Sequence, residues 1–163
     1  MRVWRELHPP LLRYLTVRGD ETPEDIASET WMDVVRGLSR FSGGPPEFRA
    51  WLFTIARHRA IDAGRARARR PVVPVAEVSS REVVPSAEDQ VVAASDTARA
   101  LALVATLPPA QAEMVMLRVV AGLEVADVAR LVDKKPGAVR VAVHRALQTL
   151  AQQPDARSNR EVV

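Results

Sequence analysis

Apolar residues recur at helical spacing along most of the chain, and the pattern is clearest between residues 123 and 151. Apolar positions three and four apart share one face of a helix, so this stretch predicts two helices joined by a tight turn. Asp133 stands at the bend, and Asp tolerates the left-handed backbone conformation better than most residues. Pro136 suits the first turn of the second helix, because an N–H there has no intrahelical partner to lose. The stretch therefore predicts a helix-turn-helix.

The second of these helices has a polar and basic side opposite its apolar stripe. The only lysines of the chain, Lys134 and Lys135, come just before it, where a cation opposes the helix dipole. That placement is favourable if phosphate oxygens arrive at the helix end, where free N–H groups also point. A DNA-reading helix is the favoured interpretation, and a helical hairpin with a solvated basic turn is the alternative. The residues expected to meet DNA are Lys134, Lys135, Gly137, Arg140, Val141, His144 and Arg145.

The first third of the chain predicts three more helices. The first covers residues 2–17 and is expected to be interrupted, or to begin, around Pro9 and Pro10. The second starts at Pro23 behind Thr22 as N-cap, and its buried side is expected to hold Ile26, Thr30, Trp31, Val34, Val35 and Leu38. Its other side presents Asp25, Glu29, Met32, Asp33 and Arg36. Residues 41–46 predict a loop, and a third helix follows from about residue 47 to 69.

A change in composition divides the chain. All seven aromatic residues lie before residue 54, and residues 71–86 combine prolines with no apolar periodicity. The sequence therefore predicts an all-α fold of two small helical domains, 1–70 and 87–153, joined by a flexible linker over 71–86. In the second domain, helices are expected from 87 to 106 and from 109 to 121, the latter ending at Gly122. A polar tail covers 154–163.

Charge is unevenly distributed although the net charge is only +3 over 163 residues. Residues 20–33 contain six acids and no base, whereas residues 49–70 contain seven arginines against Asp62 alone. Such a basic block is typical of nucleic-acid binding. With no cysteine, disulfides and thiolate metal sites are excluded. No apolar run is long enough for a membrane span or a signal peptide, so we expect a cytoplasmic protein without membrane insertion.

Three segments, taken in order, carry a family resemblance. They are TPEDIASETWMDVVRGLSRF, FRAWLFTIARHRAID with its arginine-rich end, and LPPAQAEMVMLRVVAGLEVADVARLVDKKPGAVRVAVHRALQTL. Together they resemble a bacterial RNA polymerase sigma factor of the extracytoplasmic-function group, and the resemblance covers nearly the whole chain outside the linker and the tail. It implies a transcription initiation factor without a cofactor, which binds core RNA polymerase and directs it to promoter DNA. An anti-sigma factor, common in the family, is a further implied partner.

The resemblance assigns roles to the predicted surfaces. The acidic helix would dock on the clamp helices of the largest polymerase subunit, through Asp25, Glu29, Met32, Asp33 and Arg36. The loop at 41–46 and the helix after it would recognise the minus-ten element and hold its opened strand. The residues expected there are Ser42, Gly43, Gly44, Arg49, Arg57, His58 and Arg65. The C-terminal helix-turn-helix would read the minus-thirty-five element in the major groove.

Some residues depart from the family pattern, and two other classes of protein are less consistent with the sequence. His58 stands where the family often has Asn, which weakens the transfer of a minus-ten preference. Val141 and Ala142 stand where the family usually has a small or polar residue and a basic residue, which weakens any transferred minus-thirty-five sequence. A stand-alone helix-turn-helix regulator would leave the acidic and arginine-rich helices without a role. An enzyme is disfavoured, because His8, His58 and His144 lie on separate segments and no catalytic or metal-binding motif is present.

Overall fold

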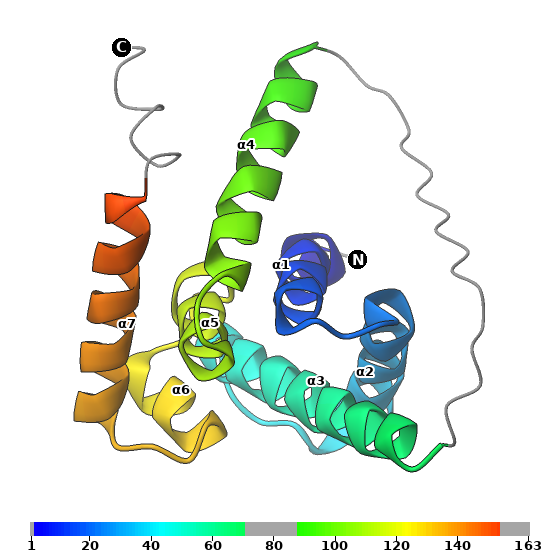
Figure 1. Cartoon of the computed structure of the whole chain (residues 1–163). Coiled ribbons are helices and arrows are strands. Elements are labelled where there is room, and N and C mark those ends of the chain that lie inside the picture. The colour runs from blue at the N-terminus through cyan, green and yellow to red at the C-terminus, as the bar shows by residue number, and fades with distance from the viewer. Residues whose placement is uncertain (1, 71–87, 154–163) are drawn as a thin grey trace.

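The computed structural model describes residues 2–70 and 88–153, and within these ranges every regular element is helical. The first half contains α1 (Arg2–Arg18), α2 (Pro23–Gly37), a 3₁₀ turn at Leu38–Arg40 and the long α3 (Pro45–Ala68). Helix α2 packs on both α1 and α3, and α3 runs beneath the other two in Figure 1. This confirms the expected all-α class. The predicted linker 71–86 and tail 154–163 lie outside the described residues.

Helix α1 continues through its two prolines, contrary to the expected interruption at that point. It runs unbroken from Arg2 to Arg18 with Pro9 and Pro10 inside it. A helical proline frees the carbonyl four residues before it, here those of Arg5 and Glu6, and both of these residues are exposed to solvent. Water can therefore satisfy the freed carbonyls, while the buried face of the helix (Leu7, Leu11, Tyr14 and Leu15) anchors both sides of the proline pair.

The buried stripe of α2 is narrower than its sequence pattern predicts. Ile26, Thr30 and Val34 are buried as expected, but Val35 is 71% exposed and Leu38 is 52% exposed. Successive residues of a helix point about 100° apart, so Val35 turns away from the face that Val34 buries. Thr22 does occupy the N-cap position, yet its side chain makes no capping hydrogen bond.

The second half contains five helical segments ending in the predicted helix-turn-helix. They are α4 (Glu88–Ala105), α5 (Pro109–Val115), a π-helical turn at Met116–Val120, α6 (Val125–Leu131) and α7 (Pro136–Gln152). The expected helix 109–121 is thus α5 continued by the π turn, and Gly122 ends it with a φ of 69°. Asp133 has a φ of 52°, and Pro136 opens α7. The left-handed bend and the proline start are both as predicted.

The two halves pack against each other. Helix α1 contacts α4, α5 and the π turn, and α3 contacts α6. Figure 1 shows α5 between α1 and α7, so the second half lies against the side of the first that carries α1 and α3. Buried residues of both halves, among them Leu11, Phe53, Met116 and Val128, belong to one hydrophobic cluster. The division into independent domains stays a prediction.

Limited proteolysis tests that division. We expect trypsin to cut between Arg65 and Arg81 and to leave two helical fragments, because the arginines at the end of α3 are exposed. The fragments should stay associated in size-exclusion chromatography through the shared core and separate only in denaturant. If domains 1–70 and 87–153 are independent, each purified fragment should regain its helical circular dichroism after refolding alone. A fragment that stays unfolded by itself would contradict two independent domains.

Candidate functional site

The outward side of α7 collects the residues predicted to read duplex DNA. Lys134, Lys135, Gly137, Arg140, Val141, His144 and Arg145 are all exposed. The helix is held from behind by Val139 and Ala146, which are buried, and the N–H of Lys134 donates to the carbonyl of Ala129 across the turn at 2.9 Å. Arg140 and His144 are one turn apart and therefore share a face. The structure brings this predicted set together on one accessible surface.

The loop at 41–46 is fixed from inside by aromatic rings. Phe41 stacks on Trp51 with ring centroids 4.9 Å apart, and Phe48 meets both rings edge-on. The N–H of Gly44 donates to the Glu47 carboxylate at 2.8 Å. Gly43 has a φ of 148°, and a Cβ there would lie 2.8 Å from the Cβ of Glu47, so the loop needs a glycine at this point. Trp51 is partly buried and packs against the core.

Arg57, predicted to meet DNA, is instead paired with a carboxylate of the second half. Glu113 on α5 accepts hydrogen bonds from the Arg57 Nε at 2.9 Å, the Arg18 Nη1 at 2.7 Å and the Tyr14 hydroxyl at 2.8 Å. We call these four residues the Glu113 cluster. The Glu113 side chain is only 12% exposed, so its charge is largely removed from water and balanced by two arginines.

Arg49, another predicted DNA contact, is also covered by the second half. It is half-buried, and a Cβ on Gly122 would lie 3.1 Å from its Nη1. The Arg49 Nε is buried and has no hydrogen-bond partner among the described residues. By contrast, Ser42, Gly43, His58 and Arg65 are exposed, and Gly44 is half-buried. The structure therefore divides the predicted strand-binding set into an accessible part and a covered part.

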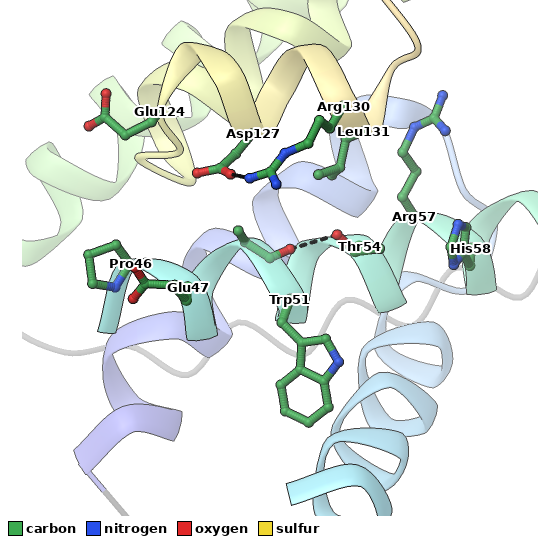
Figure 2. A pocket seen from close by; sticks show the side chains of 11 residues that line it. Pro46, Glu47, Trp51, Thr54, Arg57, His58, Glu124, Asp127, Arg130 and Leu131 are labelled. Carbon is green, nitrogen blue, oxygen red and sulfur yellow. Dashed lines mark hydrogen bonds and ion pairs between the residues drawn. The ribbon is translucent and has the colours of Figure 1, made fainter. Parts of the chain in front are cut away.

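A cleft of about 580 Å³ separates α3 from α6. Figure 2 shows Glu47 and Thr54 of α3 on one side. On the other side are Glu124, the N-cap residue of α6, and Asp127 and Arg130 of α6, with Arg130 paired to Asp127. Arg57 and His58 line the same cleft. The side of the cleft formed by α6 and its N-cap residue therefore brings the carboxylates of Glu124 and Asp127 and the guanidinium group of Arg130 close to α3, the predicted strand-binding helix.

The acidic face of α2 is less acidic than its sequence suggests. Asp25, Glu29 and Met32 are exposed, but Asp33 is bound by Arg59 of α3 at 2.6 Å and by Arg36 at 3.1 Å. The hydrogen bond from Arg59 is the main reason that the pKa of Asp33 is lowered. Arg59 also approaches Glu29 at 3.4 Å. The face is a mixed-charge surface around an exposed methionine, and Arg59 is a member that the sequence prediction missed.

The contacts within the Glu113 cluster determine which of its groups are ionised. Burial alone would raise the pKa of the Glu113 carboxyl, but hydrogen bonds from Arg57 and Tyr14 outweigh it and keep the pKa below its ordinary value of 4.5. Burial, followed by the nearby Glu113 carboxylate, raises the pKa of the Tyr14 hydroxyl. At neutral pH the cluster therefore contains an ionised carboxylate, a neutral tyrosine and two guanidinium groups.

Metal sites and membrane spans were also sought in the described ranges. No group of three or more His, Asp or Glu side chains in them could hold a metal ion. None of their helices is long and apolar enough to cross a membrane. His8 is half-buried, stacks on Trp4 and accepts a hydrogen bond from the Trp31 indole at 3.2 Å.

Comparisons with known proteins identify the class to which this arrangement belongs. The family model for Sigma-70 region 2 matches residues 3–70, and that for Sigma-70 region 4 matches residues 97–150. The chain is 37% identical to the ECF RNA polymerase sigma factor ShbA of Streptomyces griseus, an alignment that covers 88% of this chain and 81% of ShbA. It is 33% identical to SigD of Mycobacterium tuberculosis, over 91% of this chain and 73% of SigD. The chain belongs to the ECF group of RNA polymerase sigma factors.

Solved structures share the fold. CnrH, solved in complex with the cytosolic domain of CnrY, superposes with a TM-score of 0.61 at 21% identity, over 95% of this chain and 86% of CnrH. The sigma factor RpoE of Bartonella quintana, solved with the anti-sigma factor NepR, gives a TM-score of 0.60 at 22% identity. That alignment covers 91% of this chain and 93% of RpoE. The all-helical architecture is therefore that of known sigma factors.

The ionisation of the Glu113 cluster gives a pH-dependent prediction. Since the folded-state pKa of Glu113 lies below 4.5, its contribution to stability is present above pH 4.5 and is lost as the pH falls through the folded value. Glu113→Gln should lower the free energy of unfolding by roughly 1–3 kcal/mol at neutral pH. Urea denaturation of both proteins should show this difference shrinking in acid. A difference that stays constant with pH would contradict the charged role of Glu113.

Proposed function

We propose that this protein binds core RNA polymerase and directs it to particular promoters, without a catalytic step of its own. Membership of the ECF sigma factor family supports this, because region 2 and region 4 models match the two halves. The observation that carries the proposal is the accessible basic surface of α7 behind the Asp133 turn. A stand-alone helix-turn-helix regulator is not favoured, since it would leave the matched first half without a role.

The α7 surface is proposed to read the minus-thirty-five element. Arg140 and His144 lie on the exposed face of α7, where a recognition helix meets base edges in the major groove. An arginine there can donate to both O6 and N7 of a guanine. Lys134, Lys135 and Arg145 are proposed to bind phosphates, which strengthens binding without selecting sequence.

The loop at 41–46 and α3 are proposed to bind the opened minus-ten strand. The aromatic packing that fixes this loop, and the exposure of Ser42, His58 and Arg65, support the proposal. Arg49 and Arg57 belong to the same proposed surface but are covered by the second half in this arrangement. Cationic side chains along such a surface would follow the phosphates of a single strand.

The mixed-charge face of α2 is proposed to dock on the clamp helices of the polymerase. This face presents exposed Asp25, Glu29 and Met32 together with Asp33 and Arg36. We add Arg59 to this proposed surface, because its guanidinium group pairs with both Glu29 and Asp33 of α2. An anti-sigma factor is a further proposed partner, supported by the complex in which the structural relative RpoE was solved.

Two single substitutions separate base reading from phosphate binding on α7. Arg140→Ala should lose preference at one or two base pairs of the upstream element, at a cost of about 1–3 kcal/mol of discrimination. Lys135→Ala should weaken binding to all sequences alike and reduce the salt dependence by about one unit. Both variants are measured as reconstituted holoenzyme on a library of promoters with varied upstream elements. Equal loss at every upstream sequence for Arg140→Ala would make Arg140 a phosphate contact.

A charge reversal tests the polymerase surface. Asp25→Lys combined with Glu29→Lys should weaken the binding of core enzyme at least about tenfold, since like charges at an interface oppose association. The fold should be retained, because exposed charges contribute little to stability. The matched control is Glu6→Lys with Asp96→Lys, which changes the net charge equally at two exposed positions outside α2. Equal affinities of the two double variants would remove α2 from the polymerase interface.

A further inference from the structure

The outward side of α7 has an apolar centre. Helices α5 and α6 pack against α7, which lies at the edge of the molecule in Figure 1. Successive residues of a helix are about 100° apart, so Val141 lies almost directly opposite Val139, which is buried. Gly137, one turn before Val141, shares its direction, and both residues are exposed. Arg140 and Arg145 lie to either side of this line. We call Gly137 and Val141 the apolar strip of α7.

Packing within the chain does not explain why a valine stands in this strip. Val141 is 48% exposed, and in the part of the chain that the structure describes it belongs neither to the hydrophobic cluster nor to the residues packed against it. Valine is also a poorer helix former than alanine or a long polar residue, because its branched Cβ restricts side-chain rotation in a helix. Val141 therefore favours neither the core nor the helix, whereas an apolar partner laid over it would bury its side chain.

Gly137 keeps the rest of the strip free of side-chain atoms. A Cβ built at this position would meet no other atom within 4 Å, so packing among the described residues does not require a glycine here. Alanine would also favour the helix more than glycine does. The missing side chain beside Val141 lets another surface approach the strip closely. The strip is thus suited to close contact with an apolar group between two flanks that carry arginine.

The floor of the DNA major groove offers one apolar group. Every base pair presents hydrogen-bond donors and acceptors there, and thymine alone adds a methyl group on C5. A valine laid over a donor or an acceptor would remove water from that group and offer no hydrogen bond in return, which weakens binding. A valine laid over a methyl group buries apolar surface on both sides without that loss. The apolar strip therefore favours a thymine.

We propose that Val141 is a specificity-determining residue, which contacts the C5 methyl group of a thymine in the upstream element. The inference rests on the proposed function of α7, the reading of the minus-thirty-five element. It adds a base preference that arises from apolar contact to the hydrogen bonds proposed for Arg140. The residue that points most directly into the groove then recognises a methyl group, and the arginines beside it bind polar atoms.

Replacing thymine by uracil tests the contact, because it removes the methyl group and leaves every hydrogen-bonding group of the base in place. The DNA is the upstream element that the wild-type holoenzyme prefers in the promoter library. Each thymine of its two strands is replaced singly by deoxyuridine, and the affinity of reconstituted holoenzyme is measured. The proteins compared are the wild type, Val141→Ala, Val141→Thr and a matched control. The control is Val119→Ala, which shortens a valine that is 56% exposed and lies outside α7.

Uracil at one thymine should weaken binding by the wild type and by Val119→Ala about fourfold, the effect of leaving one methyl-sized apolar group unburied. Val141→Ala should bind the thymine and the uracil forms of that position equally well. Val141→Thr, which keeps one of the two methyl groups of valine, should retain part of the difference. Both substitutions are at an exposed position, so the helical circular dichroism should be unchanged.

Two results would overturn the proposal. If uracil weakens binding by the wild type at no position, the protein does not read a thymine methyl group in this element. If Val141→Ala shows the same loss on uracil as the wild type, another residue contacts the methyl group. Failure of the proposed function gives a different result: the wild-type holoenzyme would then bind every upstream element of the library alike, and the inference would fall with it.

Discussion

One carboxylate connects the two halves of this protein. Glu113 could not remain ionised and largely buried without compensating donors, and all three of its partners belong to the other half. The arginines gain from the pairing as well, since Arg18 and Arg57 lie at the edge of an apolar core. The cluster lies beside the shared hydrophobic core. Separation of the halves would therefore expose apolar surface and break the hydrogen bonds of the cluster at the same time. The arrangement is therefore expected to close and open as a unit.

The fold was largely predictable because most of its signals are local. The left-handed Asp133, the proline start of α7 and the glycine end after α5 each follow from the backbone needs of one residue. The continuity of helix α1 was not predicted by the same reasoning, since a proline pair normally interrupts a helix. Here the buried residues on both sides of the pair and the exposure of Arg5 and Glu6 before it are tertiary features. The exposure of Val35 is likewise a tertiary feature, because it depends on how much of the surface of α2 the neighbouring helices cover.

The candidate site was predictable only where a surface belongs to one helix. The face of α7 opposite its buried stripe is defined by helical periodicity alone, so every residue expected there is exposed. Arg57 also lies opposite its own apolar stripe, but periodicity cannot tell a solvent-facing side from one covered by a distant segment. Its partner Glu113 is 56 residues away, and that acid has no local pattern that marks it. The pairing of Asp33 with Arg59, 26 residues apart, was hidden in the same way.

The two proposed DNA surfaces differ in what must happen before each can be used. The α7 surface is accessible in the closed arrangement, so a duplex could approach it without any change in the packing of the halves. The proposed α3 surface includes Arg49, which lies against Gly122, and Arg57, which is paired with Glu113, so both are covered by the second half in this arrangement. A single strand exists at a promoter only after the duplex has opened, so the proposed contact of α3 would follow the proposed contact of α7. Closure in the free protein would therefore withhold the surface that binds DNA without strong sequence selection, since single-strand binding of this kind rests on charge and stacking. The base-reading surface, whose contacts distinguish one sequence from another, needs no such protection.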